Sequence, residues 1–260
     1  MNVDLNGKVA LVTGAARSIG KAIADAFAAN GAVVVYSDID LEEAARSASR
    51  SPRASAVHLN VADEAEVESV LDSIVRDKGR LDIVVNNAGV NTMAHRVTID
   101  KFPLEEWRRI FDVDLTGLYL VSKAAARIMK KQRSGRIINI SSVVGIVPLR
   151  LQCAFAAAKA GVDQLTKAMA IELGGDGILV NAIAPGSTLT EGTKKLFYAE
   201  NGQFSASVQK LLDHIPLGRP GTTEEIAAAA LFLAAPDSSY VNGHVLVVDG
   251  GWTAGFAREF

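Results

Sequence analysis

Short runs of apolar, mostly β-branched residues alternate with longer amphipathic stretches from one end of the chain to the other. Several of these runs are apolar throughout rather than alternating with polar residues, which is typical of parallel strands covered on both faces. They predict strands at Val9–Thr13, Ala32–Ser37, Ala56–Leu59, Leu81–Val85, Arg136–Ser141, Ile178–Ile183 and Val245–Val248.

The longer stretches between these runs carry apolar residues at helical spacing. They predict helices at Ser18–Ala29, Leu41–Ala48, Asp63–Lys78, Leu104–Lys131, Leu151–Glu172 and Thr223–Ala234. Three of the helices are followed by a glycine that can adopt a left-handed cap: Gly31, Gly79 and Gly174. Thr222 or Thr223, with Glu225 shortly after, indicates the start of the last helix.

This alternation predicts a single doubly wound, Rossmann-like α/β domain over residues 1–260, with a seven-stranded parallel sheet and helices on both faces. No linker, repeat or break in composition divides the chain. The least regular stretch is residues 187–217. Because loops of that length are usually functional or disordered, we expect a lid over the active site there.

The turn after the first strand carries a glycine pattern suited to binding phosphate. It reads Thr13-Gly14-Ala15-Ala16-Arg17-Ser18-Ile19-Gly20 and leads directly into a helix. Gly14 permits the tight turn, Gly20 lets the helix approach the sheet, and the helix N-terminus offers free N–H groups to a pyrophosphate. The glycines alone would also fit a plain sharp turn, but the strand–turn–helix context favours a dinucleotide. A P-loop is excluded, because the glycines are one residue too far apart and Lys21 is followed by Ala22.

Asp38 stands at the end of the second strand, where a carboxylate can accept hydrogen bonds from the adenosine ribose hydroxyls. The same carboxylate would repel a 2′-phosphate, so we expect NAD, with NADP less favoured. Two alternatives stay open. Arg17 could reach a 2′-phosphate, and Asp38 could simply cap the following helix.

Four further segments follow the later strands. They read Asn86-Asn87-Ala88-Gly89, Asn139-Ile140-Ser141-Ser142, Asn181-Ala182-Ile183-Ala184-Pro185-Gly186 and Val248-Asp249-Gly250-Gly251. Together with the glycine turn, they make essentially the whole chain resemble the short-chain dehydrogenase/reductase family. The resemblance implies an NAD(P)-dependent oxidoreductase that transfers a hydride between a nicotinamide cofactor and a hydroxyl or carbonyl substrate.

The glycine turn and this resemblance together imply a set of cofactor contacts. Asn60 stands where the family usually has aspartate, although an asparagine can still contact adenine. The expected cofactor-binding residues are Gly14, Arg17, Ser18, Ile19, Gly20, Asp38, Ile39, Asn60, Val61, Asn87, Ala88, Gly89, Lys159, Pro185, Gly186, Thr188 and Thr190.

The resemblance also implies a catalytic set of asparagine, serine, tyrosine and lysine, which this chain matches only in part. Ser142 and Lys159 occupy the serine and lysine positions. Phe155 stands where the tyrosine is expected, one helical turn before Lys159, and Asp114 replaces the asparagine. Phenylalanine keeps the ring and loses the hydroxyl. General acid–base catalysis contributes roughly 10²–10⁴-fold, so an uncompensated loss would cripple the reaction and spare cofactor binding.

Three explanations fit Phe155. The chain could be an oxidoreductase with an altered proton relay, an engineered Tyr-to-Phe inactive form, or a cofactor-binding protein without hydride transfer. Because Asp114 departs from the family pattern as well, we favour the altered relay. Its proton could pass through Asp114, Cys153, His95, Lys159 itself, or a water between Ser142 and Lys159.

The loops after strands four to six should form the substrate walls, since ligands bind at the carboxyl ends of parallel strands. We expect substrate contacts from His95, Arg150 and Gln152, and further polar or basic wall residues at Asn91, Thr92, Arg96, Thr190, Lys194 and Lys195. For each side chain alone, simple exposure to solvent is the alternative. The polar mixture, and a C-terminal tail resembling sugar and polyol dehydrogenases, favour a sugar, sugar acid or polyol.

Charge and composition limit the kinds of partner and the cellular location that we expect for this chain. A formal net charge of −2 without a basic block gives no reason to expect nucleic acid. The longest apolar stretch, Ile226–Pro236, is about half of the ~20 residues that a membrane span requires. Cys153 is the single cysteine, which favours the cytoplasm. No metal is expected. The helices Leu104–Lys131 and Leu151–Glu172 carry more apolar surface than one sheet face needs, and the family resemblance implies that they pair between subunits in a homotetramer, with a dimer second.

Overall fold

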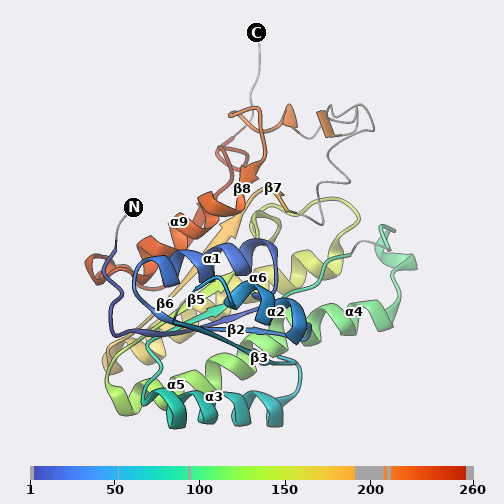
Figure 1. Cartoon of the computed structure of the whole chain (residues 1–260). Coiled ribbons are helices and arrows are strands. Elements are labelled where there is room, and N and C mark those ends of the chain that lie inside the picture. Colours follow the sequence, from blue (N-terminus) through green and yellow to red (C-terminus); the bar gives the residue numbers. More distant parts are fainter. Residues whose placement is uncertain (1–2, 52, 93–94, 191–207, 210–211, 256–260) are drawn as a thin grey trace.

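Parallel strands form the centre of the molecule and helices cover both of their faces (Figure 1). The computed structural model describes residues 3–51, 53–92, 95–190, 208–209 and 212–255. The seven-stranded sheet has the order β3-β2-β1-β4-β5-β6-β9. Its strands are β1 (Val9–Thr13), β2 (Val33–Asp38), β3 (Ala54–His58), β4 (Ile83–Asn86), β5 (Gly135–Ile140), β6 (Ile178–Pro185) and β9 (Val245–Val248).

The helices divide into two layers, and each layer has its own apolar core. On one face lie α1 (Ser18–Ala29), α2 (Leu41–Ala48) and α9 (Thr223–Ala234), and on the other lie α3 (Glu64–Lys78), α5 (Leu118–Gln132) and α6 (Cys153–Leu173). Figure 1 shows α1 and α9 above the sheet and α3 and α5 below it. Along β1, Val12 faces the first layer and Leu11 the second, as the two-residue alternation of a strand requires.

The order of the strands indicates where along the sheet a ligand site should lie. β1 pairs with β2 on one side and with β4 on the other, so the connections run in opposite directions from this point. In open parallel sheets, ligands bind outside the carboxyl ends of the strands at such a switch point. The doubly wound domain predicted from the strand and helix pattern is therefore confirmed, with strand and helix ends that differ from the prediction by one or two residues.

The predicted helix Leu104–Lys131 differs from the structure, because a π-helical segment interrupts it. The structure has α4 (Leu104–Phe111), the π segment η2 (Asp112–Gly117) and then α5. A side chain at Gly117 would meet Val61, because its Cβ would lie 2.7 Å from the Val61 Cγ2. The widened turn thus passes directly against the loop that follows β3, and it holds Asp114 in the interior. Such π segments are often found at functional sites.

One predicted helix cap is wrong. Gly174 has a helical φ of −58° and begins the short turn η4 (Gly174–Asp176). The left-handed residue is Gly177, with φ +74°, where an added Cβ would lie 2.5 Å from the Arg133 carbonyl oxygen. Because of this extra turn, the left-handed residue that ends the helix comes at Gly177, three residues later than the predicted Gly174. By contrast, Gly31 and Gly79 are left-handed, and Thr222 caps α9 with Glu225 as predicted.

The remaining described elements are short. They are η1 (Ile99–Lys101), η3 (Val143–Gly145), η5 (Pro236–Ser238), and the strands β7 (Thr188–Leu189) and β8 (Gly221–Thr222), which pair in parallel. Most of the expected lid at 187–217 lies outside the described residues, as do Lys194 and Lys195. Its described parts include Val208, Leu212 and Ile215, which pack together with Leu189 and Trp252. None of the helices described is both long and apolar enough to cross a bilayer.

Candidate active site

Two adjoining hollows open at the carboxyl ends of the strands. The outer hollow has a volume of about 610 Å³ and lies beside the glycine turn and the end of β2. The inner hollow has a volume of about 550 Å³ and lies beyond the ends of β4, β5 and β6. Both are lined by Ile19, Asn87, Gly89 and Val90, so they form one continuous trench. An extended ligand such as a dinucleotide fits this shape better than a compact one.

The glycine turn is fastened to the end of β4. The Asn87 side-chain amide donates hydrogen bonds to the carbonyls of Thr13 and Gly14, at 2.9 Å and 3.0 Å. The Thr13 hydroxyl in turn accepts from the backbone N–H groups of Asn87 and Ala88, each at 3.0 Å. A Cβ on Gly20 would lie 2.2 Å from the Gly14 carbonyl oxygen. Only glycine allows this close approach, which leaves the first turn of α1 open toward the trench.

Ser18, the first residue of α1, has a left-handed backbone with φ +56°. This conformation is uncommon for a residue other than glycine and is strained by contact between Cβ and the following carbonyl. Ser18 lines the outer hollow at the start of the helix. Strain of this kind persists where the surrounding structure imposes it, frequently in ligand-binding turns.

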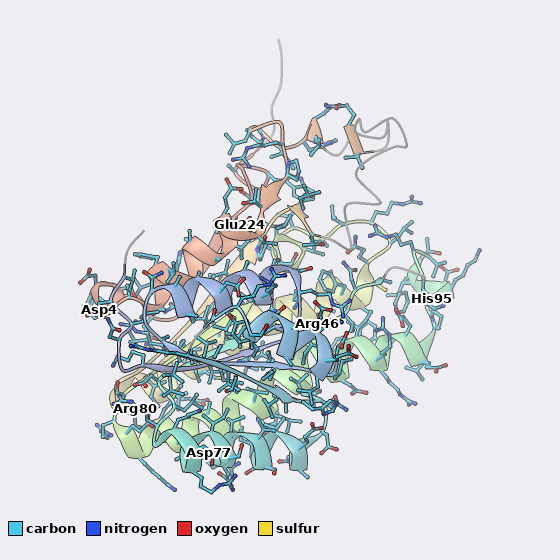
Figure 2. All side chains as sticks on the ribbon, viewed as in Figure 1. Asp4, Arg46, Asp77, Arg80, His95 and Glu224 are labelled. Carbon is cyan, nitrogen blue, oxygen red and sulfur yellow. The ribbon has the colours of Figure 1, made fainter. Side chains whose placement is uncertain are left out.

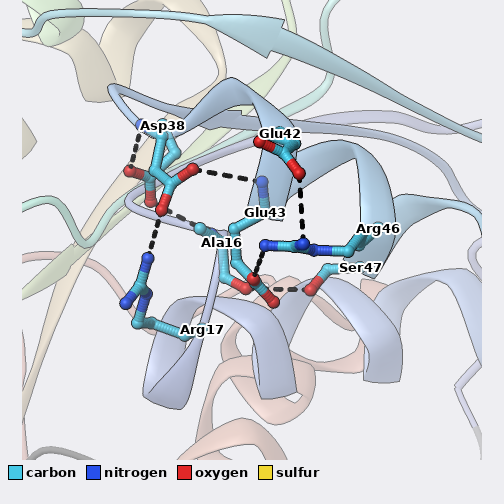
Figure 3. A network of polar contacts seen from close by, with 8 residues as sticks. Ala16, Arg17, Asp38, Glu42, Glu43, Arg46 and Ser47 are labelled. Atoms are coloured by element: carbon cyan, nitrogen blue, oxygen red, sulfur yellow. Dashed lines mark hydrogen bonds and ion pairs between the residues drawn. The ribbon is translucent and has the colours of Figure 1, made fainter.

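The far end of the outer hollow is acidic. Asp38 accepts hydrogen bonds from the backbone N–H groups of Ala16 and Asp40, each at 3.0 Å, which fixes its carboxylate at the rim. Arg17 forms an ion pair with Asp40 instead of pointing freely into the hollow. Figure 3 shows this network, with Ala16 hydrogen-bonded to Asp38. The arrangement suits a ribose with two free hydroxyls, since an added 2′-phosphate would meet the Asp38 carboxylate.

At the other end of the trench, Lys159 is buried and surrounded by three different groups. Its ammonium nitrogen lies 3.1 Å from Asp114 Oδ2, with both side chains less than a tenth exposed. It also donates a hydrogen bond of 3.1 Å to the Ile140 carbonyl. The Phe155 ring lies one helical turn earlier in α6, with its centroid 5.6 Å from the same nitrogen. The charge of Lys159 is thus paired with a carboxylate, and no hydroxyl stands at position 155.

Asp114 is held from its other side as well. Its Oδ1 accepts a hydrogen bond of 2.7 Å from the backbone N–H of Val90. A Cβ on Gly89 would lie 3.1 Å from Asp114 Oδ2. The carboxylate is therefore clamped between the loop after β4 and Lys159, which fixes its position in the inner hollow.

Behind Lys159, a buried chain of polar side chains ties β4, β5 and α6 together. Asn86 donates to Asn139 at 2.9 Å, and Asn139 donates to the Thr166 hydroxyl at 2.9 Å. Ser141 donates to the Lys159 carbonyl at 3.3 Å. Close by, burial raises the pKa of Asp163, and its hydrogen bond with Ser141 partly offsets that rise. This network fixes α6, and hence Lys159, against the sheet.

The structure brings most of the predicted site residues to the trench. The inner hollow is lined by the predicted residues Asp114, Ser142, Gln152, Phe155, Lys159, Pro185, Gly186, Thr188 and Thr190. The outer hollow is lined by Gly14, Arg17, Ser18, Ile19, Gly20, Asp38, Ile39, Asn60, Val61, Asn87, Ala88 and Gly89. Ser142 lies at the start of η3, where its hydroxyl accepts a hydrogen bond of 3.2 Å from the Val144 N–H.

Two predicted substrate residues lie elsewhere. His95 does not line the inner hollow, and its side chain is 45% exposed and 3.9 Å from Glu106 of α4. Figure 2 places His95 at the periphery of the molecule. Arg150 is exposed and likewise does not line the hollow. Cys153, one of the expected relay candidates, is also absent from its walls.

Some wall residues were not expected from the sequence. Val90, Leu149 and Trp252 line the inner hollow with apolar surface. Trp252 directly follows the final glycine pair, and an aromatic residue at that place was the one signal available in the sequence. Among the described residues, no cluster of three metal-binding side chains occurs.

Comparisons with known proteins agree with this geometry. Residues 14–253 match the family described as Enoyl-(Acyl carrier protein) reductase. The chain is 43% identical to a 3-oxoacyl-[acyl-carrier-protein] reductase from Thermotoga maritima, over 95% of this chain and 98% of that protein. It is 40% identical to a trans-4-hydroxycyclohexanecarboxylate dehydrogenase from Sinomonas cyclohexanicum, over 95% of this chain and 93% of that protein.

A solved structure is similar throughout. A gluconate 5-dehydrogenase from Burkholderia cenocepacia J2315, in complex with NADP and tartrate, is 36% identical, with a TM-score of 0.89 and 97% of each chain covered. The glycine turn, the open trench and Lys159 fit a nicotinamide dinucleotide, the cofactor that this family binds. From this geometry and these relatives, we conclude that the chain belongs to the short-chain dehydrogenase/reductase family of NAD(P)-dependent oxidoreductases.

Proposed function

We propose that this chain oxidises a polar alcohol or reduces the corresponding carbonyl with a nicotinamide cofactor, and that its proton relay works without a tyrosine. The buried contact between Lys159 and Asp114 in the inner hollow carries this proposal. Phe155 occupies the place where the family resemblance implies a tyrosine. The lysine–carboxylate pair, next to Ser142, supplies the ionisable groups that a phenylalanine cannot.

The chain's own residues take three roles. When bound, the nicotinamide accepts or supplies the hydride. Ser142 hydrogen-bonds the substrate oxygen and orients it in the inner hollow. On alcohol oxidation, Lys159 Nζ gives one of its ammonium protons to Asp114 Oδ2 and takes up the proton that the substrate hydroxyl releases, so that the lysine ends as an ammonium and Asp114 as a carboxylic acid. The hydride and the proton together account for the two hydrogens that the alcohol loses.

We propose NAD as the preferred cofactor, with NADP less favoured. Asp38 is fixed at the rim of the outer hollow by two backbone N–H groups, and Arg17 is engaged by Asp40. The similar gluconate 5-dehydrogenase is described in complex with NADP. The proposed preference for NAD over NADP therefore rests on the charge of Asp38 in this chain and not on the cofactor of a similar protein.

The substrate class also remains a proposal. The similar proteins are named for a 3-oxoacyl chain on a carrier protein, for trans-4-hydroxycyclohexanecarboxylate and for gluconate. The inner hollow has apolar walls at Leu149 and Trp252 and polar groups at Gln152 and Arg96. This mixture supports a small polar substrate such as a sugar, sugar acid or polyol.

The test measures dinucleotide binding and turnover separately. NAD and NADP are titrated against the protein by fluorescence, and formation of reduced nicotinamide is then followed with sugars, sugar acids, polyols and 3-oxoacyl thioesters. Asp114→Asn should keep dinucleotide affinity and lower the rate roughly 10²-fold or more, because the relay loses its carboxylate. An equally active Asp114→Asn protein would contradict the relay. Dinucleotide binding without turnover of any substrate by the unmodified chain would favour the inactive or non-enzymatic alternative.

We propose a homotetramer, with a dimer as the second choice. Two separate faces carry exposed apolar side chains. Tyr119 of α5 and Ile171 of α6 are 46% and 85% exposed, and Phe232 of α9 and Val247 of β9 are 38% and 37% exposed. Two such faces can support two interfaces. Light scattering would test the homotetramer by measuring the mass of the protein in solution.

We also propose a cytoplasmic location, which the single cysteine, Cys153, supports.

A further inference from the structure

Gln152 is a buried polar side chain that has no hydrogen-bond partner among the residues that the structure describes. It is 4% exposed, lines the inner hollow and stands directly before α6. Its side chain does not cap the helix, and this side chain makes no hydrogen bond with any other described residue. Because an amide inside a protein normally has a partner, the Gln152 amide is available to a ligand in the hollow.

The backbone before Gln152 is shaped to hold it there. Leu151 has a left-handed φ of +65°, which is unfavourable for a leucine. The Gln152 amide therefore enters the hollow from a turn that the surrounding structure imposes. The same hollow contains Ser142 and Lys159, so a ligand at Gln152 lies within reach of the reacting groups.

Arg96 adds a positive charge at the mouth of this hollow. It is exposed to solvent, lines the hollow and forms no ion pair with any described acid. The neighbouring acid Glu106 is engaged by Arg109, whose Nε and Nη2 donate hydrogen bonds of 2.7 Å and 2.8 Å. The acid in the described wall of the hollow is Asp114, and it is paired with Lys159. The wall therefore keeps one positive charge in excess.

We propose that Gln152 and Arg96 bind the carboxylate of the substrate, so that this chain acts on hydroxy acids or the corresponding oxo acids. This inference rests on the proposed function and deepens it. An arginine guanidinium matches a carboxylate with two parallel hydrogen bonds, and an amide N–H can complete the set. A single uncompensated charge suits a monoanion. Neutral polyols would leave both groups without their partner.

Two matched pairs of ligands test the proposal on the dinucleotide-loaded protein. Gluconate is compared with glucitol, and trans-4-hydroxycyclohexanecarboxylate with 4-(hydroxymethyl)cyclohexanol, by calorimetric titration. In at least one pair, the acid should bind on the order of tenfold more tightly than the alcohol. Arg96→Gln and, separately, Gln152→Leu should remove most of that preference. Arg108→Gln, which removes an exposed positive charge on α4, should leave it unchanged.

The outcomes separate this inference from the function on which it rests. Equal binding of acid and alcohol in both pairs, or binding of neither, overturns the carboxylate site, and this comparison needs no variant. A preference that survives both substitutions overturns the assignment to these residues. Failure to bind any dinucleotide would instead contradict the proposed function.

Discussion

The ammonium of Lys159 lies 3.1 Å from the carboxylate of Asp114, and the two side chains come from different helical segments that meet beneath the inner hollow. Both are buried, so each charge depends on the other for compensation. Removing one partner of a buried pair leaves an uncompensated charge, which typically costs about 3–5 kcal/mol.

We therefore expect Asp114→Ala to lower the free energy of unfolding by about 3–5 kcal/mol. Asp114→Asn should cost less, because its amide oxygen can still accept the hydrogen bond from the Val90 N–H. Urea denaturation of both variants measures the difference. Equal stability of Asp114→Ala and the unmodified chain would show that the pair is unimportant for folding.

Substitution of Gly20 should weaken dinucleotide binding. An alanine Cβ would lie 2.2 Å from the Gly14 carbonyl oxygen and 2.4 Å from Asn87 Nδ2, so the turn and α1 must separate. We expect Gly20→Ala to weaken NAD binding by roughly tenfold or more, or about 1.4 kcal/mol. Gly175→Ala is the control, because nothing lies within 4 Å of its added Cβ. Unchanged affinity in Gly20→Ala would contradict the assignment of the phosphate turn.

The strained backbone at Ser18 predicts a stabilising substitution. Glycine removes the steric cost of φ +56°, although it also gains entropy in the unfolded chain. The net effect of Ser18→Gly should be an increase of about 0.5–1 kcal/mol in the free energy of unfolding. Thermal or urea denaturation without ligand measures it, and a less stable variant would show that Ser18 is not strained.

Cofactor preference should depend on Asp38. Asp38→Asn removes the negative charge and keeps one oxygen, which can still accept a hydrogen bond from the N–H of either Ala16 or Asp40, although these two groups bond to different oxygens of the carboxylate. We expect the ratio of NADP to NAD affinity to rise roughly tenfold or more. Glu42→Gln removes an exposed carboxylate of the neighbouring helix and should leave the ratio unchanged. A chain that already prefers NADP would contradict the proposal directly.

Glu225, in the first turn of α9, should make the free energy of unfolding depend on pH. Hydrogen bonds from Arg219 and from the Thr222 backbone lower the pKa of Glu225 from 4.5 to about 2. A lowered folded-state pKa stabilises the fold above pH 4.5, and that stability is lost as the pH falls from 4.5 toward 2.

Because the Glu225 side chain is 41% exposed, screening by solvent limits the effect to about 1 kcal/mol at neutral pH. Glu225→Gln should therefore be less stable than the unmodified chain at neutral pH, and the gap should close on acidification. Urea denaturation across this range measures the gap. A difference that does not change with pH would show that ionisation of Glu225 contributes nothing.

The cofactor half of the site could be predicted from the sequence because it follows local rules. A strand, a glycine turn and a helix lie together in the chain, and Asp38 stands at the end of the next strand. The parallel sheet then brings the ends of β4, β5 and β6 to the same edge without further information.

The residues of the catalytic half could be named through the family resemblance, but their contacts depend on tertiary packing that no local pattern reveals. The π segment that buries Asp114 forms where Gly117 passes against Val61, far away in the sequence. His95 was expected in the substrate wall, yet it lies beside Glu106 of α4. Arg109 of α4 donates a hydrogen bond of 3.3 Å to the Asn91 carbonyl and so ties the start of that loop to the helix. The positions of these side chains follow from tertiary packing and could not be read from the spacing of residues along the sequence.

The rate of hydride transfer in Phe155→Tyr tests the central claim most directly. Dinucleotide and substrate are kept saturating, and the formation of reduced nicotinamide is compared between this variant and the unmodified chain. We expect rates within about tenfold of each other, because Lys159 and Asp114 already move the proton. A rise of roughly a hundredfold or more on restoring the hydroxyl, the scale of general acid–base catalysis, would contradict it and identify the chain as an inactive form of a tyrosine-dependent enzyme.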